Sequence, residues 1–172
     1  LDVTGRNDWS STLSRGNWSY FYPSVSGSIV FDKLCNFAEK APWFTFLKLR
    51  ASWANVGKDT EPYAISQDYN STSYPGSFRP NSTMANSALK PENVETFEVG
   101  LEMKFLKNRI GFDVAWYRSD ITNQIFNVPY DYLTGAYTYT QNIGLIRNQG
   151  IEMSASFVPV KTKNWTWTIN VN

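Results

Sequence analysis

Strict alternation of apolar and polar side chains is the feature that most constrains the fold of this chain. In residues 96–105, Phe97, Val99, Leu101 and Met103 alternate without exception with polar residues or glycine. A period of two is the spacing of side chains along one face of a β-strand. The same pattern recurs at residues 1–6, 22–31, 47–54, 110–117, 151–158 and 165–171. The sequence therefore predicts an all-β, antiparallel sheet of about seven meandering strands.

The two faces of this predicted sheet differ in chemistry. The apolar positions of the runs carry no charged residue, whereas the alternate positions mix charged residues with Ser, Thr and Gly. One face should therefore contact an apolar environment, and the other should contact water or a polar interior. We interpret the charged side chains of the second face as lining a lumen or pairing with one another. They are Arg6, Asp8, Lys48, Arg50, Glu98, Glu102, Lys104, Asp113 and Glu152.

The connections between the strands alternate in length. Those at residues 7–17, 57–95 and 129–137 are long, while those at residues 106–109 and 160–164 are short. The connection at residues 32–44 is intermediate and could hold a short helical turn. Long loops at one end of a sheet and short turns at the other are typical of transmembrane β-barrels. Aromatic residues near the strand ends fit the two girdles of such a barrel, among them Tyr20, Phe21, Tyr22, Trp43, Trp116 and Trp165.

A soluble, carbohydrate-binding β-sandwich is the alternative fold. Its strands also alternate apolar and polar residues, and such modules can be rich in Trp. The two alternatives differ in what covers the apolar face, which is lipid in a barrel and a second sheet in a sandwich.

Composition and charge exclude several functional classes. The 172 residues include no His and a single cysteine, Cys35. The formal net charge of the chain is +1. The chain therefore lacks imidazole bases and cysteine clusters, and its balanced charge argues against nucleic acid as a partner. Glu98 and Glu102 lie about 13 Å apart along a strand, too far for a glycosidase pair. We predict no enzyme activity, no metal site and no cofactor.

Four motifs in order resemble one known family. They are TGRNDWSSTL with YPSVSGSIVF at residues 4–13 and 22–31, LKLRASWANVGKDT at residues 47–60, ALKPENVETFEVGLEMKFLKNRIGFDVAWY at residues 88–117, and NIGLIRNQGIEMSASFVPV at residues 142–160. On these motifs the chain resembles the SusC/RagA family of TonB-dependent outer-membrane receptors.

This resemblance implies a transmembrane β-barrel of 22 strands. Because the chain begins at Leu1 without Met and ends at Asn172 inside an alternating run, we expect residues 1–172 to be one part of that barrel, truncated at both ends. The N-terminal plug and the TonB-contacting segment would lie outside it. The resemblance further implies TonB-dependent import of oligosaccharide, or of peptide in some members, across the outer membrane of a Gram-negative, Bacteroidetes-like cell. The implied partners are a SusD-like surface lipoprotein, TonB and the lipid bilayer, and a siderophore or cobalamin receptor is the alternative.

Aromatic residues in the long connections are the candidate ligand contacts. The connection at residues 57–95 is far longer than a hairpin needs, and loops of that size are usually functional or disordered. Rings among Ser, Thr and Asn can stack on sugar faces, pack against a lid protein, or pack on neighbouring loops. The candidates are Trp9, Trp18, Tyr63, Tyr69, Tyr74, Phe78, Arg79, Tyr130, Tyr132 and Tyr137.

Two other features are interpreted as architectural rather than functional. Pro91 fixes its own φ and favours an extended Lys90, which suits the return of a long loop into a strand. Gly100, Gly144 and Gly150 are expected to mark kinks or close approaches within strands.

Overall fold

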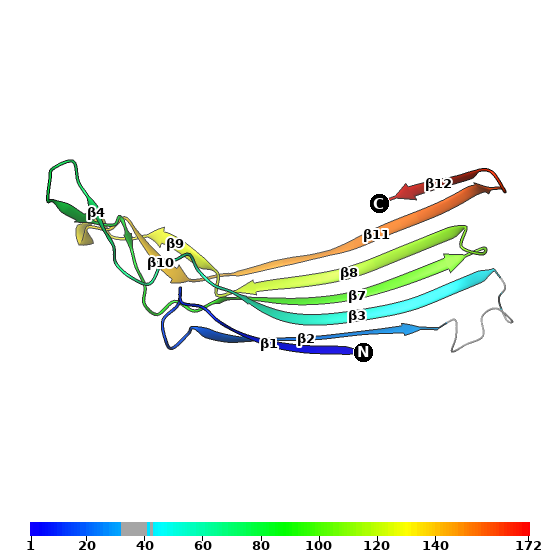
Figure 1. The fold of residues 1–172 in the computed structure, drawn as a ribbon, viewed down its shortest axis with the longest axis horizontal. Helices are drawn as coiled ribbons and strands as arrows, with labels where there is room; N and C mark the ends of the chain where they lie inside the picture. The colour runs from blue at the N-terminus through cyan, green and yellow to red at the C-terminus, as the bar shows by residue number, and fades with distance from the viewer. Residues whose placement is uncertain (32–40, 42) are drawn as a thin grey trace.

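Seven antiparallel strands form one long sheet (Figure 1). The computed structural model describes residues 1–31, 41 and 43–172. The strand order is β1-β2-β3-β7-β8-β11-β12, so each strand pairs with the preceding one of the sheet. Every predicted run falls in one strand to within one residue at its ends, which confirms the all-β meander. The strands are β1 (Asp2–Trp9), β2 (Ser19–Val30), β3 (Phe44–Lys58), β7 (Glu92–Phe105), β8 (Ile110–Thr122), β11 (Leu145–Lys161) and β12 (Thr166–Val171).

The long connections gather at one end of this sheet and are themselves folded (Figure 1). A hairpin and a small three-stranded sheet lie there, and a 3-10 turn, η1 (Tyr132–Thr134), follows β9. No helix in the described part of the chain is long and apolar enough to cross a membrane. The hairpin joins β4 (Tyr69–Ser71) to β5 (Phe78–Pro80), and the small sheet contains β6 (Thr83–Met84), β10 (Thr138–Asn142) and β9 (Ile125–Pro129).

The third long connection is longer than the sequence predicted. It runs over residues 123–144, between the end of β8 and the start of β11, and the expected residues 129–137 form only its tip. Asn123 (φ 55°) and Gly144 (φ 88°) turn the chain out of the main sheet and back into it. The residues between them form a separate hairpin, in which β9 pairs with β10.

Short turns join the strands at the opposite end. In the turn at residues 106–109, Leu106, Lys107 and Asn108 all have positive φ, and the N–H of Arg109 donates to the carbonyl oxygen of Phe105 at 3.0 Å. Residues 162–165 join β11 to β12. The expected helical turn at residues 32–44 lies mostly outside the described residues, and Cys35 lies wholly outside them.

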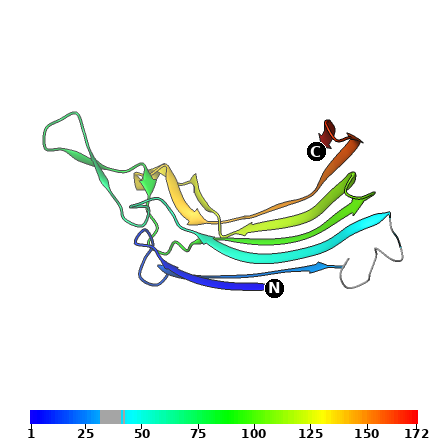
Figure 2. The same ribbon diagram turned by 45° about the vertical axis from the view of Figure 1, so that its right-hand side comes forward.

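The register keeps apolar residues together on one face of the sheet. Leu101 pairs with Leu49 on one side and with Val114 on the other, and Val114 pairs with Met153. We call the face that carries this row the apolar face, and the opposite face the polar face. Large side chains of the apolar face stay exposed, with Ile151 at 71% and Met153 at 57%. The strands form a single curved layer (Figure 2), not the two packed sheets of a sandwich.

Aromatic rings form two rows on the apolar face. Near the short turns, four rings form a row in which each contacts the next, with centroids 5.9 to 6.2 Å apart. In order they are Trp43, Phe105, Phe112 and Phe157. Nearer the long connections, Phe97 and Trp116 meet edge to face at 5.9 Å, and Trp53 pairs with Phe97 across the strands.

Tyr20 and Tyr22 depart from the predicted girdle. They pair with Asp8 and Arg6 on the polar face, whereas Phe21 between them follows the apolar face. The reason is the alternation itself, because adjacent residues of a strand point to opposite faces.

Candidate functional site

The folded connections line a half-open cavity of about 690 Å³ at the end of the main sheet. One wall comes from residues 58–64, where the chain leaves β3, and another from Asn81, Thr83 and Ala85 around β6. Ile125 and Asn127 of β9 and Thr140 of β10 complete it. The volume lies within the range of about 300 to 1,000 Å³ that is typical of small-ligand sites.

Glu92 anchors the connections around this cavity. It is only 8% exposed, and its Oε1 accepts a hydrogen bond from the backbone N–H of Ile125 at 2.9 Å. Its Oε2 lies 3.7 Å from Nζ of Lys58, so one carboxylate links the end of β3 to the start of β9.

The segment before Glu92 is held equally firmly. The side-chain Oδ1 of Asn142 accepts from the N–H of Lys90 at 2.8 Å, and its Nδ2 donates to the carbonyl oxygen of Lys90 at 2.8 Å. Leu89 is fully buried, and its carbonyl oxygen accepts from Nδ2 of Asn17 at 2.9 Å. These contacts tie the segment to β10 and to the connection between β1 and β2, and its architectural interpretation stays a prediction.

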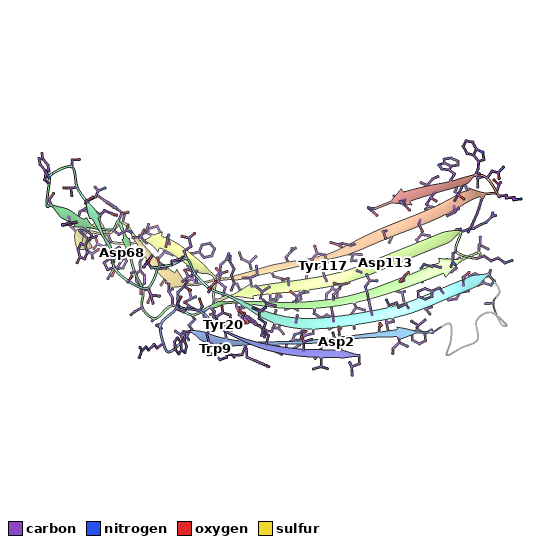
Figure 3. The ribbon with its side chains drawn as sticks, in the orientation of Figure 1. Asp2, Trp9, Tyr20, Asp68, Asp113 and Tyr117 are labelled. Carbon is purple, nitrogen blue, oxygen red and sulfur yellow. The ribbon has the colours of Figure 1, made fainter. Side chains whose placement is uncertain are left out.

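The lining of the cavity is polar and carries more carboxylates than cations. Asp59 accepts a hydrogen bond from Oγ of Ser10 at 2.6 Å, and Lys58 is paired with Glu92. Glu61 is exposed, as is Asp68, which lies at the loop end of the molecule (Figure 3). Hydroxyl and amide groups supply most of the remaining polar atoms, from Thr60, Ser66, Asn81, Thr83, Asn127 and Thr140. Such a lining can hydrogen-bond a solute rich in hydroxyl or amide groups.

Tyr63 is the predicted ligand contact that lines this cavity. Its side chain is exposed, and its φ of 68° lies in the left-handed region, which is unusual for a bulky residue. Such a conformation persists only where the surrounding structure holds it. The carbonyl oxygen of Tyr63 accepts from the N–H of Ser66 at 3.1 Å, which closes the turn.

The other predicted contacts do not join Tyr63 in one site. Trp9 ends β1 and lines a neighbouring hollow of about 750 Å³ together with Tyr20 and Tyr22. Trp18 directly precedes β2, and its carbonyl oxygen accepts from the N–H of Ser10 at 2.8 Å. The remaining predicted contacts lie in the β4–β5 hairpin (Tyr69, Tyr74, Phe78 and Arg79) and in the β9–β10 connection (Tyr130, Tyr132 and Tyr137).

The prediction missed the acidic residues of the lining, Asp59, Glu61, Asp68 and Glu92. It selected aromatic residues in the long connections, and these carboxylates occupy the same connection. The signal that could have indicated them is the excess of acidic over basic residues within residues 57–95.

A second polar arrangement lies on the polar face of the sheet itself. The guanidinium of Arg50 donates two hydrogen bonds to Asp113, at 2.8 and 2.7 Å, and its Nε lies 3.5 Å from Oε1 of Glu98. Arg50 belongs to β3 and Asp113 to β8, so the side chain crosses β7 above Gly100. A Cβ at Gly100 would lie 2.5 Å from Cζ of Arg50, which confirms a close approach at this glycine.

The same face carries further contacts of this kind. Arg6 pairs with Asp8 at 2.7 Å and Lys104 with Glu102 at 2.8 Å, so charged residues of the polar face pair with one another as expected. Gly150 also marks a close approach, because a Cβ there would lie 3.0 Å from the hydroxyl oxygen of Tyr117.

Comparison with known proteins places the chain among bacterial receptors. Residues 1–172 match the family described as TonB dependent receptor-like, beta-barrel. The chain is 31% identical to the TonB-dependent receptor SusC of Bacteroides thetaiotaomicron, over 98% of this chain and 18% of that protein. It is 28% identical to the TonB-dependent receptor P26 of Formosa agariphila, over 97% of this chain and 17% of that protein. The chain thus spans less than a fifth of the length of these curated relatives.

Solved structures share the fold. The RagAB peptide importer in its closed-closed state superposes with a TM-score of 0.84 at 24% identity, over 98% of this chain and 19% of that one. The siderophore receptor PirA from Pseudomonas aeruginosa gives a TM-score of 0.57 at 17% identity, over 91% of this chain and 28% of that one. At these identities the likeness concerns the fold alone.

Proposed function

We propose that this chain, which belongs to the TonB-dependent receptor β-barrel family, forms seven adjacent strands in the wall of an outer-membrane nutrient importer. The observation that carries the proposal is the uncovered apolar face between two aromatic rows. In water this face would be unfavourable, whereas lipid would solvate it. The outer strands β1 and β12 each leave an unpaired edge, and closure into a larger barrel would pair both.

The height of the apolar face supports this placement. Phe105 belongs to the row near the short turns, and Glu95 is the charged residue of β7 that lies on the same face ten residue steps away. At about 3.3 Å per residue the two lie ~33 Å apart along the strand. A strand tilt of ~40° turns this into a rise of ~25 Å, the height of the apolar band in outer-membrane barrels.

We further infer that the barrel imports an oligosaccharide or a peptide by a TonB-dependent mechanism. Similarity to the receptor SusC and to the RagAB peptide importer supports this inference. By the same analogy, a SusD-like surface lipoprotein would bind at the end with the long connections, and TonB would contact a plug-associated segment outside this chain. The cell outer membrane is the inferred location. The strands need only a polar lining for this role, so we propose no catalytic activity.

Within this function, the cavity beyond the main sheet is the proposed ligand contact. Its size suits a few sugar units or a short peptide, and its lining offers hydroxyl, amide and carboxylate groups. Tyr63 would supply the ring that stacks on the ligand. Ligand contact by the other predicted aromatic residues stays a prediction.

A nutrient panel followed by two matched variants tests this function. A strain that lacks the receptor gene should lose growth on one class of glycans or peptides, and the intact gene should restore it. Tyr63→Ala should then weaken uptake of that nutrient about tenfold, the effect of losing about 1.4 kcal/mol of binding energy. Phe126→Ala is the control, because Phe126 lies between the lining residues Ile125 and Asn127 on the opposite face of β9. Parental growth of the deletion strain on every nutrient would contradict the import function.

A further inference from the structure

The polarity of the two faces reverses near the long connections. On the face that is apolar along most of the sheet, Asp120 pairs across the strands with Glu95 and with Arg147. Arg118 lies one step closer to the short turns on the same face and pairs with Phe97. We call these four charged residues, Glu95, Arg118, Asp120 and Arg147, the outer ionic row.

The opposite face changes in the complementary sense. At the level where Asp120 and Arg147 occupy one face, the neighbouring residues on the other face are Val56, Val94, Ile121 and Ile146, which pair with one another across four strands. The charges of the outer ionic row therefore stand on the side that faces lipid lower down. Their level lies just beyond the apolar band.

Two arginine side chains converge on one carboxylate in this row. Arg147 donates from Nε to Oδ1 of Asp120 at 2.7 Å and from Nη2 to Oδ2 at 3.1 Å. Arg118 donates from Nε and Nη2 to Oδ2 of Asp120 at 3.1 and 2.7 Å. The side chain of Asp120 is 17% exposed, while those of Arg118 and Arg147 are 41% and 46% exposed.

These contacts leave donors free on the exposed side. A guanidinium has five N–H donors, and each arginine uses two on Asp120, so three remain on each. Arg118, Asp120 and Arg147 together carry one excess positive charge, which Glu95 brings to zero over the whole outer ionic row. Glu95 lies on the Trp53 side of the row, where its Oε1 accepts from Nε1 of Trp53 at 2.9 Å.

The position of the arginines favours a lipid headgroup as the occupant. Trp53 and Phe97 lie at the level of Arg118, and Trp116 lies one step closer to the short turns. These rings form the aromatic row that marks the edge of the apolar band. A lipid whose chains cover Val99 and Leu101 would carry its headgroup at the level of Arg118 and Arg147. Guanidinium groups match the geometry of phosphate oxygens, which can accept two parallel N–H bonds.

We propose that Arg118 and Arg147 bind the phosphate of an anionic lipid headgroup in the outer leaflet. Asp120 is a positioning residue that holds the two guanidinium groups side by side on adjacent strands. The inference rests on the proposed function only in requiring that the apolar face contacts lipid.

Lipid retention by the full-length receptor tests the proposal. The receptor is reconstituted in nanodiscs of equal parts phosphatidylcholine and phosphatidylglycerol, extracted, and analysed for the ratio of the two lipids that stay bound. The parental receptor should retain phosphatidylglycerol preferentially, and the double variant Arg118→Gln with Arg147→Gln should lose that preference about tenfold. Arg15→Gln, at an exposed position in the connection between β1 and β2, should retain it.

A second variant keeps the test decisive if the double glutamine variant fails to fold. Arg118→Lys with Arg147→Lys preserves both charges but removes the planar donor pair, so the preference should fall partway. A folded double variant of either kind with parental lipid preference would overturn the inference. Failure of the membrane placement would differ, because the receptor would then not insert into nanodiscs at all, and failure of the import function would appear only in the nutrient panel.

Discussion

Replacing Gly100 by Ala should destabilise the sheet solely because Arg50 on the neighbouring strand crosses it. The added methyl carbon would lie 2.5 Å from Cζ of Arg50 and 2.8 Å from its Nη2. These atoms are the far end of a flexible side chain, so the guanidinium swings away while the backbone stays in place. The cost is therefore the lost contact with Asp113, together with the weaker one with Glu98.

The magnitude follows from the geometry of that contact. Its two hydrogen bonds are short, and the side chains of Arg50 and Asp113 are 32% and 36% exposed. Exposed ion pairs contribute about 0.2 to 1 kcal/mol, and hydrogen bonds to charged groups about 1.5 to 3 kcal/mol, so this pair contributes about 1 to 2 kcal/mol. Ala in place of Gly regains about 0.5 to 1 kcal/mol within a strand. The free energy of unfolding should fall by a net amount of about 0.75 kcal/mol, the difference between the two central values.

The same Gly100→Ala substitution made in an Arg50→Ala variant distinguishes this mechanism from a general destabilisation by Ala at position 100. In Arg50→Ala nothing crosses β7, so Gly100→Ala should raise the free energy of unfolding by about 0.5 to 1 kcal/mol. Urea unfolding of the receptor in detergent micelles measures both backgrounds. The effect of Gly100→Ala should thus change sign between them, and destabilisation of equal size in both would refute the reasoning.

Two further predictions concern the faces and the turns. Val114→Arg should lower the free energy of unfolding by about 2 to 4 kcal/mol if the residue lies near the bilayer midplane, whereas Ser154→Arg on the polar face should cost less; equal penalties would mean that the faces are misassigned. Lys107→Gly should raise the free energy of unfolding by about 0.5 to 1 kcal/mol, because Lys107 has a φ of 56° that glycine adopts without strain, and Lys107→Ala should bring no such gain.

Alternation alone was sufficient to predict the seven strands. The run around Leu101 pairs with the runs around Leu49 and Val114 in the register that keeps all three on one face. A shift by one residue would move every apolar side chain to the other face, so burial of one face specifies the register strongly. The third long connection was misjudged because alternation cannot indicate which sheet a strand joins.

The candidate site was predicted less completely, because it depends on contacts between distant segments. The cavity forms where β10 pairs in parallel with β6, through Thr138 with Thr83 and Tyr139 with Met84. No local pattern in either segment encodes that pairing. The contact of Arg50 with Asp113 has the same origin, since it spans 63 residues of sequence and requires a glycine on the strand between them.

Cysteine accessibility in intact cells tests the orientation of the barrel most directly. Ser82 and Lys163 are exposed and lie at opposite ends of the sheet, Ser82 between β5 and β6 and Lys163 between β11 and β12 (Figure 1). Each is replaced by Cys in a Cys35→Ser background and exposed to a membrane-impermeant maleimide. We predict labelling of Ser82→Cys in intact cells, and labelling of Lys163→Cys only after the outer membrane is permeabilised. Labelling of Lys163→Cys but not of Ser82→Cys in intact cells would contradict it.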